Sequence, residues 1–134
     1  MKKKLTIVTV LLALICALCA FSACGKADID PVVLKPSDSD MEIAETTTLL
    51  DYMDYLVGKG ELKYEISGTM ITSINGVKNG TKSFWMLYCD DTANSNGDWG
   101  TCEYGGKTYY SATAGASELI VADGCTYIWS YETF

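Results

Sequence analysis

The side chains best suited to chemistry lie in the stretch 90–103, which reads DDTANSNGDWGTCE. Four of them fall at positions 3, 5, 6 and 12 of an EF-hand-type calcium loop: Asn94, Asn96, Gly97 and Glu103. Position 1 should be Asp but is Thr92. The stretch predicts either a weak calcium site or a turn cluster whose polar side chains bond their own backbone. The candidate calcium ligands are Asp91, Asn94, Asn96 and Asp98.

Four aromatic residues lie in or beside the same stretch: Trp99, Tyr104, Tyr109 and Tyr110. Exposed aromatic rings suit flat ligands, such as sugars or a corrin, and they suit protein partners. The alternative is ordinary cross-strand packing within a hairpin. Both interpretations stay open, and these four residues are the candidates for binding a ligand or a partner. Trp85 and Trp129 lie in the two strongest predicted strands and are assigned to the core.

Three cysteines fall in or beside predicted strands: Cys89, Cys102 and Cys125. Outside the cytosol such thiols tend to pair. The favoured pair is Cys89–Cys102, which would close the intervening loop and stabilise the fold by about 3 kcal/mol. The other two pairings, or three unpaired and buried thiols, are the alternatives.

The composition argues against catalysis and against nucleic-acid binding. The 134 residues include no His and no Arg, and 17 acidic residues against 10 lysines give a net charge of -7. The commonest general base and metal ligand is therefore missing. Asp90 and Asp91 are neighbours that would point to opposite faces of a strand. Phosphate binding needs a basic face, which this chain lacks. We expect a protein that is not an enzyme, with no nucleic-acid partner.

The first 24 residues predict where the protein is located. Residues 1–4 (MKKK) are basic, and residues 5–23 carry no charge. A basic start, an apolar stretch and small residues before a cut site are typical of a secretory signal peptide. Ser22-Ala23-Cys24 resembles the lipobox of bacterial lipoproteins, with Phe21 in place of the usual Leu.

We therefore expect a lipoprotein signal peptide at residues 1–23, a lipid-bearing Cys24 and a tether over residues 24–45. Two acyl chains anchor a protein stably, so the predicted location is the extracellular face of the bacterial membrane. A plain secreted protein and an uncleaved transmembrane helix are the alternatives. After cleavage seven lysines remain against 17 acidic residues, a net charge of −10, which is repelled by anionic membranes.

One helix is predicted after the tether. Thr48 and Asp51 form a loose capping box. Leu49, Leu50, Met53, Leu56 and Val57 then share one helical face, and Gly58 or Gly60 ends the helix. Upstream, residues 32–34 lie between two prolines and fit either a spacer or a short edge strand.

The rest of the chain reads as strands. Ser83–Cys89 is apolar on both faces, which indicates a central strand. Asn75-Gly76 and Gly105-Gly106 each predict a hairpin turn. The predicted strands are 62–66, 70–74, 83–89, 101–104, 107–112, 119–121 and 125–131. The fold class is therefore α+β, with one short helix packed on a mostly antiparallel sheet.

The order of these elements resembles the transcobalamin-like C-terminal domain, over residues 46–134. The matching pieces are Thr48-Leu49-Leu50, Ile71–Val77, Trp85–Tyr88, Asp123-Gly124 and Tyr127–Tyr131. The resemblance implies a small β-grasp-like fold, found in bacterial surface lipoproteins of largely unknown function. Because the family takes its name from animal cobalamin carriers, it also suggests cobalamin or another corrinoid as a bound ligand.

Two functions remain at this level. The first is a non-catalytic interaction or accessory module on the cell surface, with a surface protein, a glycan or a small molecule as its partner. The alternative is a corrinoid-binding lipoprotein that serves uptake. A domain of this size can cover only one face of a corrinoid, which favours the first.

Overall fold

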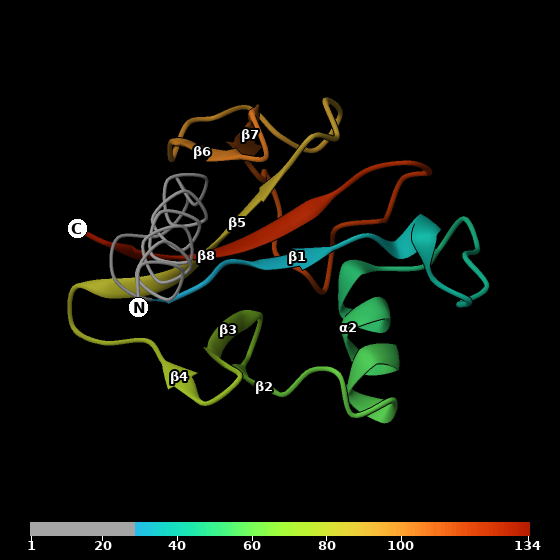
Figure 1. Cartoon of the computed structure of the whole chain (residues 1–134), viewed down its shortest axis with the longest axis horizontal. Coiled ribbons are helices and arrows are strands. Elements are labelled where there is room, and N and C mark those ends of the chain that lie inside the picture. Colours follow the sequence, from blue (N-terminus) through green and yellow to red (C-terminus); the bar gives the residue numbers. More distant parts are fainter. Residues whose placement is uncertain (1–28) are drawn as a thin grey trace, which may run out of the picture.

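The computed structural model describes residues 29–134, so the predicted signal peptide and Cys24 lie outside it. These residues form two antiparallel sheets and one α-helix (Figure 1). The predicted α+β class, with one short helix and mostly antiparallel strands, is confirmed at this level. No helix in residues 29–134 has the length and apolar character needed to span a bilayer.

The main sheet has five strands in the order β1-β8-β5-β7-β6, all antiparallel. Their bounds are Val32–Leu34 (β1), Ser83–Cys89 (β5), Thr101–Tyr104 (β6), Lys107–Ser111 (β7) and Tyr127–Thr133 (β8). β5 pairs with β8 along its whole length and has β7 on its other side. Its central place confirms the prediction from its two apolar faces.

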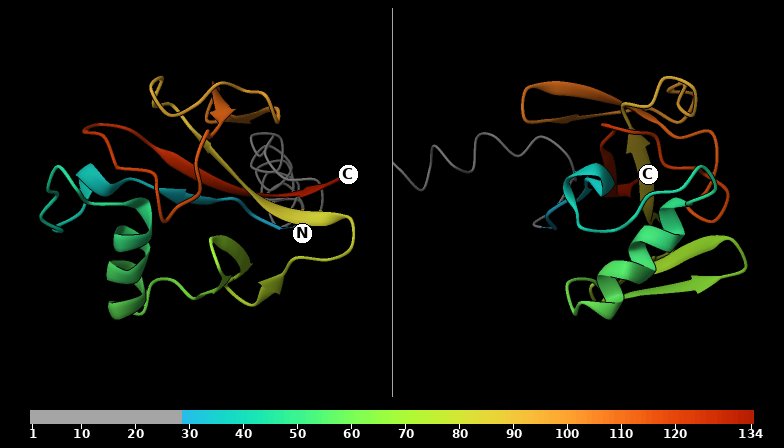
Figure 2. Two further views of the ribbon diagram at one scale, coloured as in Figure 1. Left: turned by 180° about the vertical axis from the view of Figure 1, so that it is seen from behind. Right: turned by 90° about the vertical axis from the view of Figure 1, so that its right-hand side faces the viewer.

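The small sheet has three strands in the order β2-β3-β4, and it lies with the helix on one side of the main sheet (Figure 2). The strands are Tyr64–Ser67 (β2), Met70–Ile74 (β3) and Val77–Lys78 (β4). Asn75 and Gly76 both adopt positive φ, as the two central residues of a tight hairpin turn must, and they join β3 to β4. The predicted strand at 62–66 begins two residues later in the structure.

Helix α2 spans Leu49–Gly58 and begins with the predicted capping box. Thr48 accepts a hydrogen bond from the Asp51 amide, and the Asp51 carboxylate accepts one from the Thr48 amide. The helix packs Leu49, Tyr52 and Met53 into the core, whereas Val57 is 42% exposed. Leu50 and Leu56 are partly buried against the same core, so the predicted apolar stripe is confirmed except at Val57, and Tyr52, which was not assigned to it, is buried as well.

Residues 32–34 form the edge strand β1, paired with β8, rather than a spacer. Leu34 is buried, and Pro36 is buried in the following 3-10 turn η1 (Pro36–Asp38). The predicted tether over 24–45 is therefore wrong for this part of its range. The folded domain begins near Val32 rather than at residue 46, because the β1–β8 ladder and the burial of Leu34 hold this segment on the sheet.

Residues 119–121 were predicted as a strand but form only one isolated bridge, between Ile120 and Thr48. The segment instead holds the start of α2. The Leu119 carbonyl accepts a hydrogen bond from the Leu49 amide, and the Val121 amide donates to the Thr47 carbonyl. Its backbone groups are therefore satisfied by the helix start and not by a sheet ladder.

The main core lies between α2, the small sheet and one face of the main sheet. Trp85 and Trp129 both belong to it, as predicted. The Trp85 indole donates a hydrogen bond to the Val77 carbonyl over 2.8 Å and so joins the two sheets. A second, smaller apolar cluster covers the other face of the main sheet around Tyr88, Tyr109 and Ile128.

Candidate functional site

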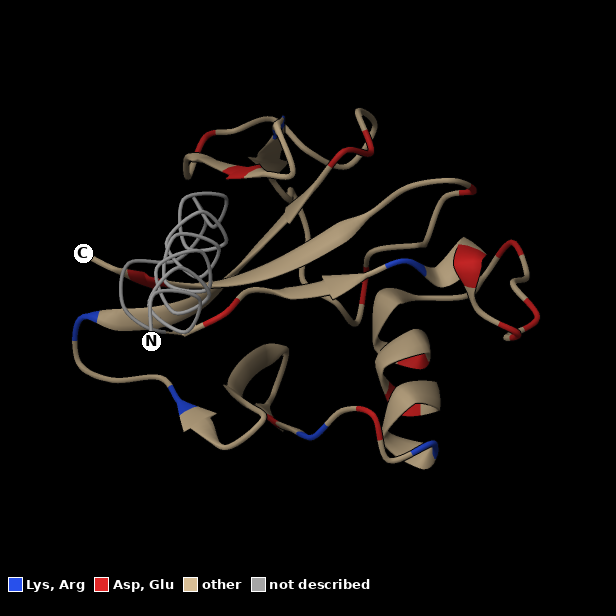
Figure 3. Ribbon diagram, in the orientation of Figure 1, with Lys and Arg blue, Asp and Glu red and all other residues tan. Residues whose placement is uncertain are grey.

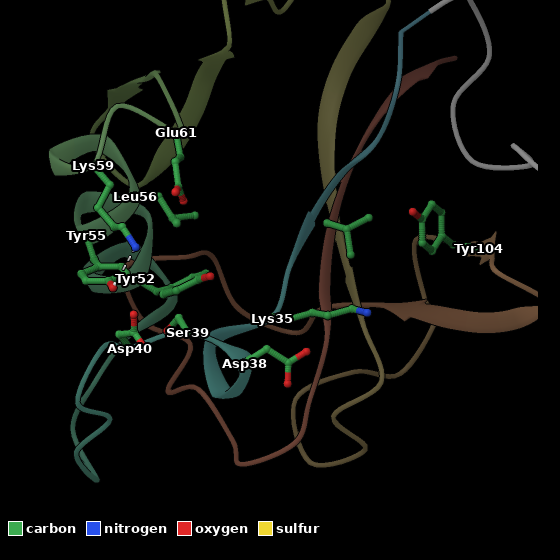
Figure 4. Close-up of a pocket in the computed structure, with 11 residues that line it drawn as sticks. Lys35, Asp38, Ser39, Asp40, Tyr52, Tyr55, Leu56, Lys59, Glu61 and Tyr104 are labelled. Atoms are coloured by element: carbon green, nitrogen blue, oxygen red, sulfur yellow. Dashed lines mark hydrogen bonds between the residues drawn. The ribbon is translucent and has the colours of Figure 1, made fainter.

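A polar pocket of about 510 Å³ opens beside α2, η1 and the edge strand β1 (Figure 4). It brings together five charged side chains and three tyrosines from separate elements. They are Lys35, Asp38, Asp40, Lys59, Glu61, Tyr52, Tyr55 and Tyr104. This group is called the polar pocket below.

Helix α2 supplies one wall of the polar pocket. Tyr52, Tyr55 and Lys59 follow one another at spacings of three and four residues, which places them on one helical face. The Tyr52 and Tyr55 rings stack with centroids 6.0 Å apart. Lys59 Nζ donates to the Tyr55 hydroxyl over 3.3 Å and lies 5.1 Å from the centroid of that ring. The hydrogen bond to Tyr55 raises the pKa of Lys59, so this ammonium stays charged.

The turn η1 supplies the facing wall. Pro36 at its first position has no amide hydrogen to satisfy, and Ser39 closes the turn by donating to the Pro36 carbonyl over 2.6 Å. Burial raises the pKa of Tyr52, and the Ser39 hydroxyl partly offsets this, so Tyr52 is a neutral hydrogen-bonding group. Asp38 and Asp40 are exposed at the rim.

A second hollow, the apolar groove, measures about 430 Å³ and is lined by Phe84, Met86, Trp99 and Phe134. Trp99 is 72% exposed and Phe134 is 67% exposed. The ring centroids of Phe84 and Phe134 lie 6.3 Å apart. The Trp99 amide donates a hydrogen bond to the buried Ser111 hydroxyl over 3.0 Å. The backbone at Trp99 is therefore held in place while its indole stays exposed.

The four candidate aromatic residues do not form one cluster. Trp99 lines the apolar groove, and Tyr104 lines the polar pocket. Tyr109 is buried in the second apolar cluster. Tyr110 is half exposed, and its ring lies against Gly97. Cross-strand packing therefore accounts for Tyr109, while Trp99 and Tyr104 remain candidates for binding.

The candidate calcium ligands divide into two separate pairs. Asn94 donates to the buried Asp91 carboxylate over 2.6 Å, and Asn96 donates to Asp98 over 2.9 Å. Asp91 also accepts from the Ala93 amide. These bonds are those of a turn cluster. No group of three or more His, Cys, Asp or Glu residues within 29–134 is placed to hold a metal ion.

The predicted Cys89–Cys102 disulfide is not formed. Cys89 and Cys125 are free thiols, whereas Cys102 is not. Cys89 lies on β5 and Cys102 on β6, with β7 between them, so their backbones stand roughly 10 Å apart, beyond the reach of a disulfide. Cys89 also belongs to the main core, whereas Cys102 belongs to the cluster on the opposite face.

The two free thiols lie in an acidic corner beside Asp90 and Asp91. Burial raises the pKa of Cys89. Burial, followed by the charges of Asp90 and Asp91, raises the pKa of Cys125 to about 11. Burial alone would raise the pKa of Asp90 too, but the Lys107 ammonium at 2.7 Å and the Thr126 amide lower it below the ordinary value. The corner therefore holds the Asp90 carboxylate and protonated thiols at neutral pH.

Alkylation of the cysteines should test the raised pKa of Cys125. Only the thiolate reacts, and its fraction at Cys125 should rise about tenfold per pH unit towards pH 11. At pH 7 we expect Cys125 to react about a hundredfold more slowly with iodoacetamide than a thiol of pKa 9.0. Peptide mapping by mass spectrometry measures the modification of each cysteine. The control is the chain in urea, where Cys125 should react at the ordinary rate; equal rates in the folded and unfolded chain would contradict the shift.

Of the residues that line the polar pocket, only Tyr104 was predicted from the sequence as a binding residue. The spacing of Tyr52, Tyr55 and Lys59 was available as a signal of a polar stripe beside the apolar one. Lys35 and Asp38 carry no local signal, because they reach the pocket only once β1 has joined the main sheet.

No family model, no curated protein and no solved structure matches the chain.

Proposed function

We propose that the chain is a lipid-anchored, non-catalytic binding module on the extracellular face of a bacterial membrane, and that the polar pocket is its binding site. The observation that carries this proposal is that three tyrosines and charged groups of both signs line one hollow. Lysine and carboxylate side chains there can pair with a ligand of mixed charge, and the rings supply flat apolar contact.

The size of the pocket fits a small ligand or one segment of a partner. A volume of about 510 Å³ lies within the range of roughly 300–1,000 Å³ that is usual for ligand sites. The hollow is open and partly polar, which suits a soluble ligand or an exposed peptide segment.

The charge of the pocket favours a cation. Its acids, Asp38, Asp40 and Glu61, outnumber its lysines, and the mature chain as a whole is acidic. The field of an acidic protein draws cations towards such a hollow. Lys35 and Lys59 provide counterparts for an anionic group on the same ligand.

The tyrosine rings offer a face for an ammonium group. The Lys59 ammonium already lies over the Tyr55 ring, which shows that this face accepts a cation. A ligand ammonium could displace Lys59 and take its place. A cation over an aromatic ring contributes about 0.5–2 kcal/mol. We therefore propose amino-acid or peptide ligands that carry an ammonium group.

Titration with glycyl-lysyl-glycine tests this proposal. We expect calorimetry to detect its binding, and Tyr55→Ala should weaken binding from about twofold to about thirtyfold, the factor that corresponds to a loss of 0.5–2 kcal/mol. Tyr110→Ala is the matched control, because Tyr110 is a half-exposed tyrosine outside the pocket. N-acetyl-glycyl-glutamyl-glycine, which carries no ammonium group, should bind more weakly. Equal affinities for both peptides, or equal losses in both variants, would reject the polar pocket as the site.

The corrinoid alternative is supported by the resemblance to transcobalamin-like domains. A helix at 49–58, a hairpin at 70–78 and paired strands carrying Trp85 and Trp129 support that resemblance and the β-grasp-like description. The test is to mix the protein with cobalamin, remove the free ligand by size exclusion and read the visible spectrum of the protein peak. A coloured peak would favour the corrinoid, and a colourless one would remove it.

A further inference from the structure

We infer that the apolar groove is a membrane-contact surface that seats the domain on the bilayer holding its lipid anchor. The inference rests on the anchoring part of the proposed function and does not involve the polar pocket. It follows from where the chain enters the fold, how far Cys24 can lie from it, and which side chains are exposed there.

The sheet register fixes where the chain enters. Val32 pairs with Trp129 in the antiparallel β1–β8 ladder, so the chain before Val32 runs towards Glu132 and Phe134. Phe84 pairs with Glu132 at the same end of the sheet. Figure 1 shows β1 beginning and β8 ending on the same side of the molecule. The apolar groove therefore lies at the end of the main sheet from which the chain leads back to Cys24.

The length of this connection limits the distance to the bilayer. Five residue steps separate Cys24 from Ile29, and a fully extended chain spans at most about 18 Å over that number. An acylated Cys24 lies at the membrane surface. The end of the main sheet that carries the apolar groove is therefore held close to the lipid headgroups, at a distance of about the length of one strand.

The exposed side chains suit that position. Trp concentrates at the interface between lipid and water, where its apolar ring is buried and its N–H stays hydrated, and Phe adds apolar surface that inserts beside it. Trp99 and Phe134 are the two most exposed aromatic residues of the described chain, and Phe84 and Met86 extend the apolar surface between them. The Phe134 amide donates to the carbonyl of exposed Lys82, which places a lysine beside the groove.

Charge selects the kind of membrane. Asp30 precedes Val32 and Glu132 pairs with Phe84, so both acids lie at the same end of the sheet as Lys82. Acidic positions are spread over the whole ribbon (Figure 3), and the mature chain carries −10 overall. A surface rich in anionic lipid repels such a domain. The groove therefore makes its contact by apolar insertion rather than by attraction to negative headgroups, and a neutral bilayer is the better partner.

Fluorescence quenching by brominated lipid tests the contact. The full lipidated chain is reconstituted on phosphatidylcholine vesicles with plain or brominated acyl chains. Trp99 is the exposed tryptophan, since Trp85 and Trp129 are 6% and 5% exposed. One of the three tryptophans should then be quenched, a loss of about a third of the emission. Trp99→Phe should abolish the loss, and Phe134→Ser should reduce it while Tyr110→Ser does not.

The outcomes separate this inference from the proposed function. Vesicle flotation with quenching supports the contact. Flotation without quenching, with Trp99 open to aqueous iodide, overturns the contact and leaves the anchor standing. Protection from iodide without lipid quenching also overturns it, because another molecule, such as a second copy of the chain, then covers the groove. A chain that does not float overturns both the contact and the anchor, while peptide binding at the polar pocket is measured separately.

Discussion

Replacing Trp85 with alanine is expected to lower the free energy of unfolding by about 3–5 kcal/mol. The side chain is 6% exposed and fills the space between the main and small sheets. Its ring meets Tyr131 edge-on at 5.2 Å, and its indole nitrogen donates to the Val77 carbonyl. The substitution creates a cavity and leaves this carbonyl of β4 without its partner, so both sheets lose support.

Urea denaturation followed by circular dichroism measures the loss. Trp85→Phe is a graded control, because it keeps most of the apolar contact and removes the indole hydrogen bond, and we expect it to cost about 1–3 kcal/mol. Trp99→Ala is the control for an exposed tryptophan, with a change within about 0.5 kcal/mol. If Trp85→Ala cost no more than Trp99→Ala, the two sheets would not depend on this side chain.

Replacing Cys24 with serine is expected to abolish lipid modification completely. In the proposed lipoprotein a diacylglycerol group would be attached to the Cys24 thiol, and serine offers no sulfur. Each buried methylene of the chains contributes about 0.8 kcal/mol to membrane binding, so their loss changes partition by many orders of magnitude. Mass spectrometry of the intact protein measures the modification. The natural chain should begin at Cys24 and carry the added lipid mass.

Cys89→Ser provides the matched control, since Cys89 is a buried thiol of the main core and should leave the lipid mass unchanged. A natural chain that still begins at Met1 and carries no lipid would refute the predicted lipoprotein signal peptide. A chain cleaved at another residue without lipid would instead support the plain secreted protein.

Local signals in the sequence predicted the local structure. Thr48 and Asp51 predicted the start of α2, because a capping box involves only neighbours along the chain. Asn75-Gly76 and Gly105-Gly106 predicted their hairpin turns, because those turns need positive φ. The two apolar faces of residues 83–89 predicted a central strand, because a strand covered on both sides lies inside a sheet.

The strand order could not be read in the same way. β8 inserts between β1 and β5, and β7 rather than β6 pairs with β5. The Cys89–Cys102 prediction failed for this reason, since closeness along the chain implied closeness in the sheet. Likewise, residues 119–121 have the composition of a strand, but their hydrogen bonds go to the start of α2.

The polar pocket depends on the same long-range placement. Lys35 and Lys59 lie far apart in sequence, and they line one pocket only because β1 joins β8 while α2 packs below the sheet. Trp99 is different, since the sequence made it a candidate for binding, with packing in a hairpin as the alternative, and the structure leaves its indole 72% exposed. Sequence patterns could thus propose a single exposed ring but not a site assembled from distant elements.

The pairing of β1 with β8 has a mechanical consequence. In the proposed lipoprotein, a pull on the lipid anchor would enter the fold along β1. It is transmitted to β8 through the ladder formed by Val32, Val33 and Leu34. Force along a strand loads all of its cross-strand hydrogen bonds in shear at once, instead of opening them one after another. The entry point of the chain can therefore bear tension without peeling the edge strand away.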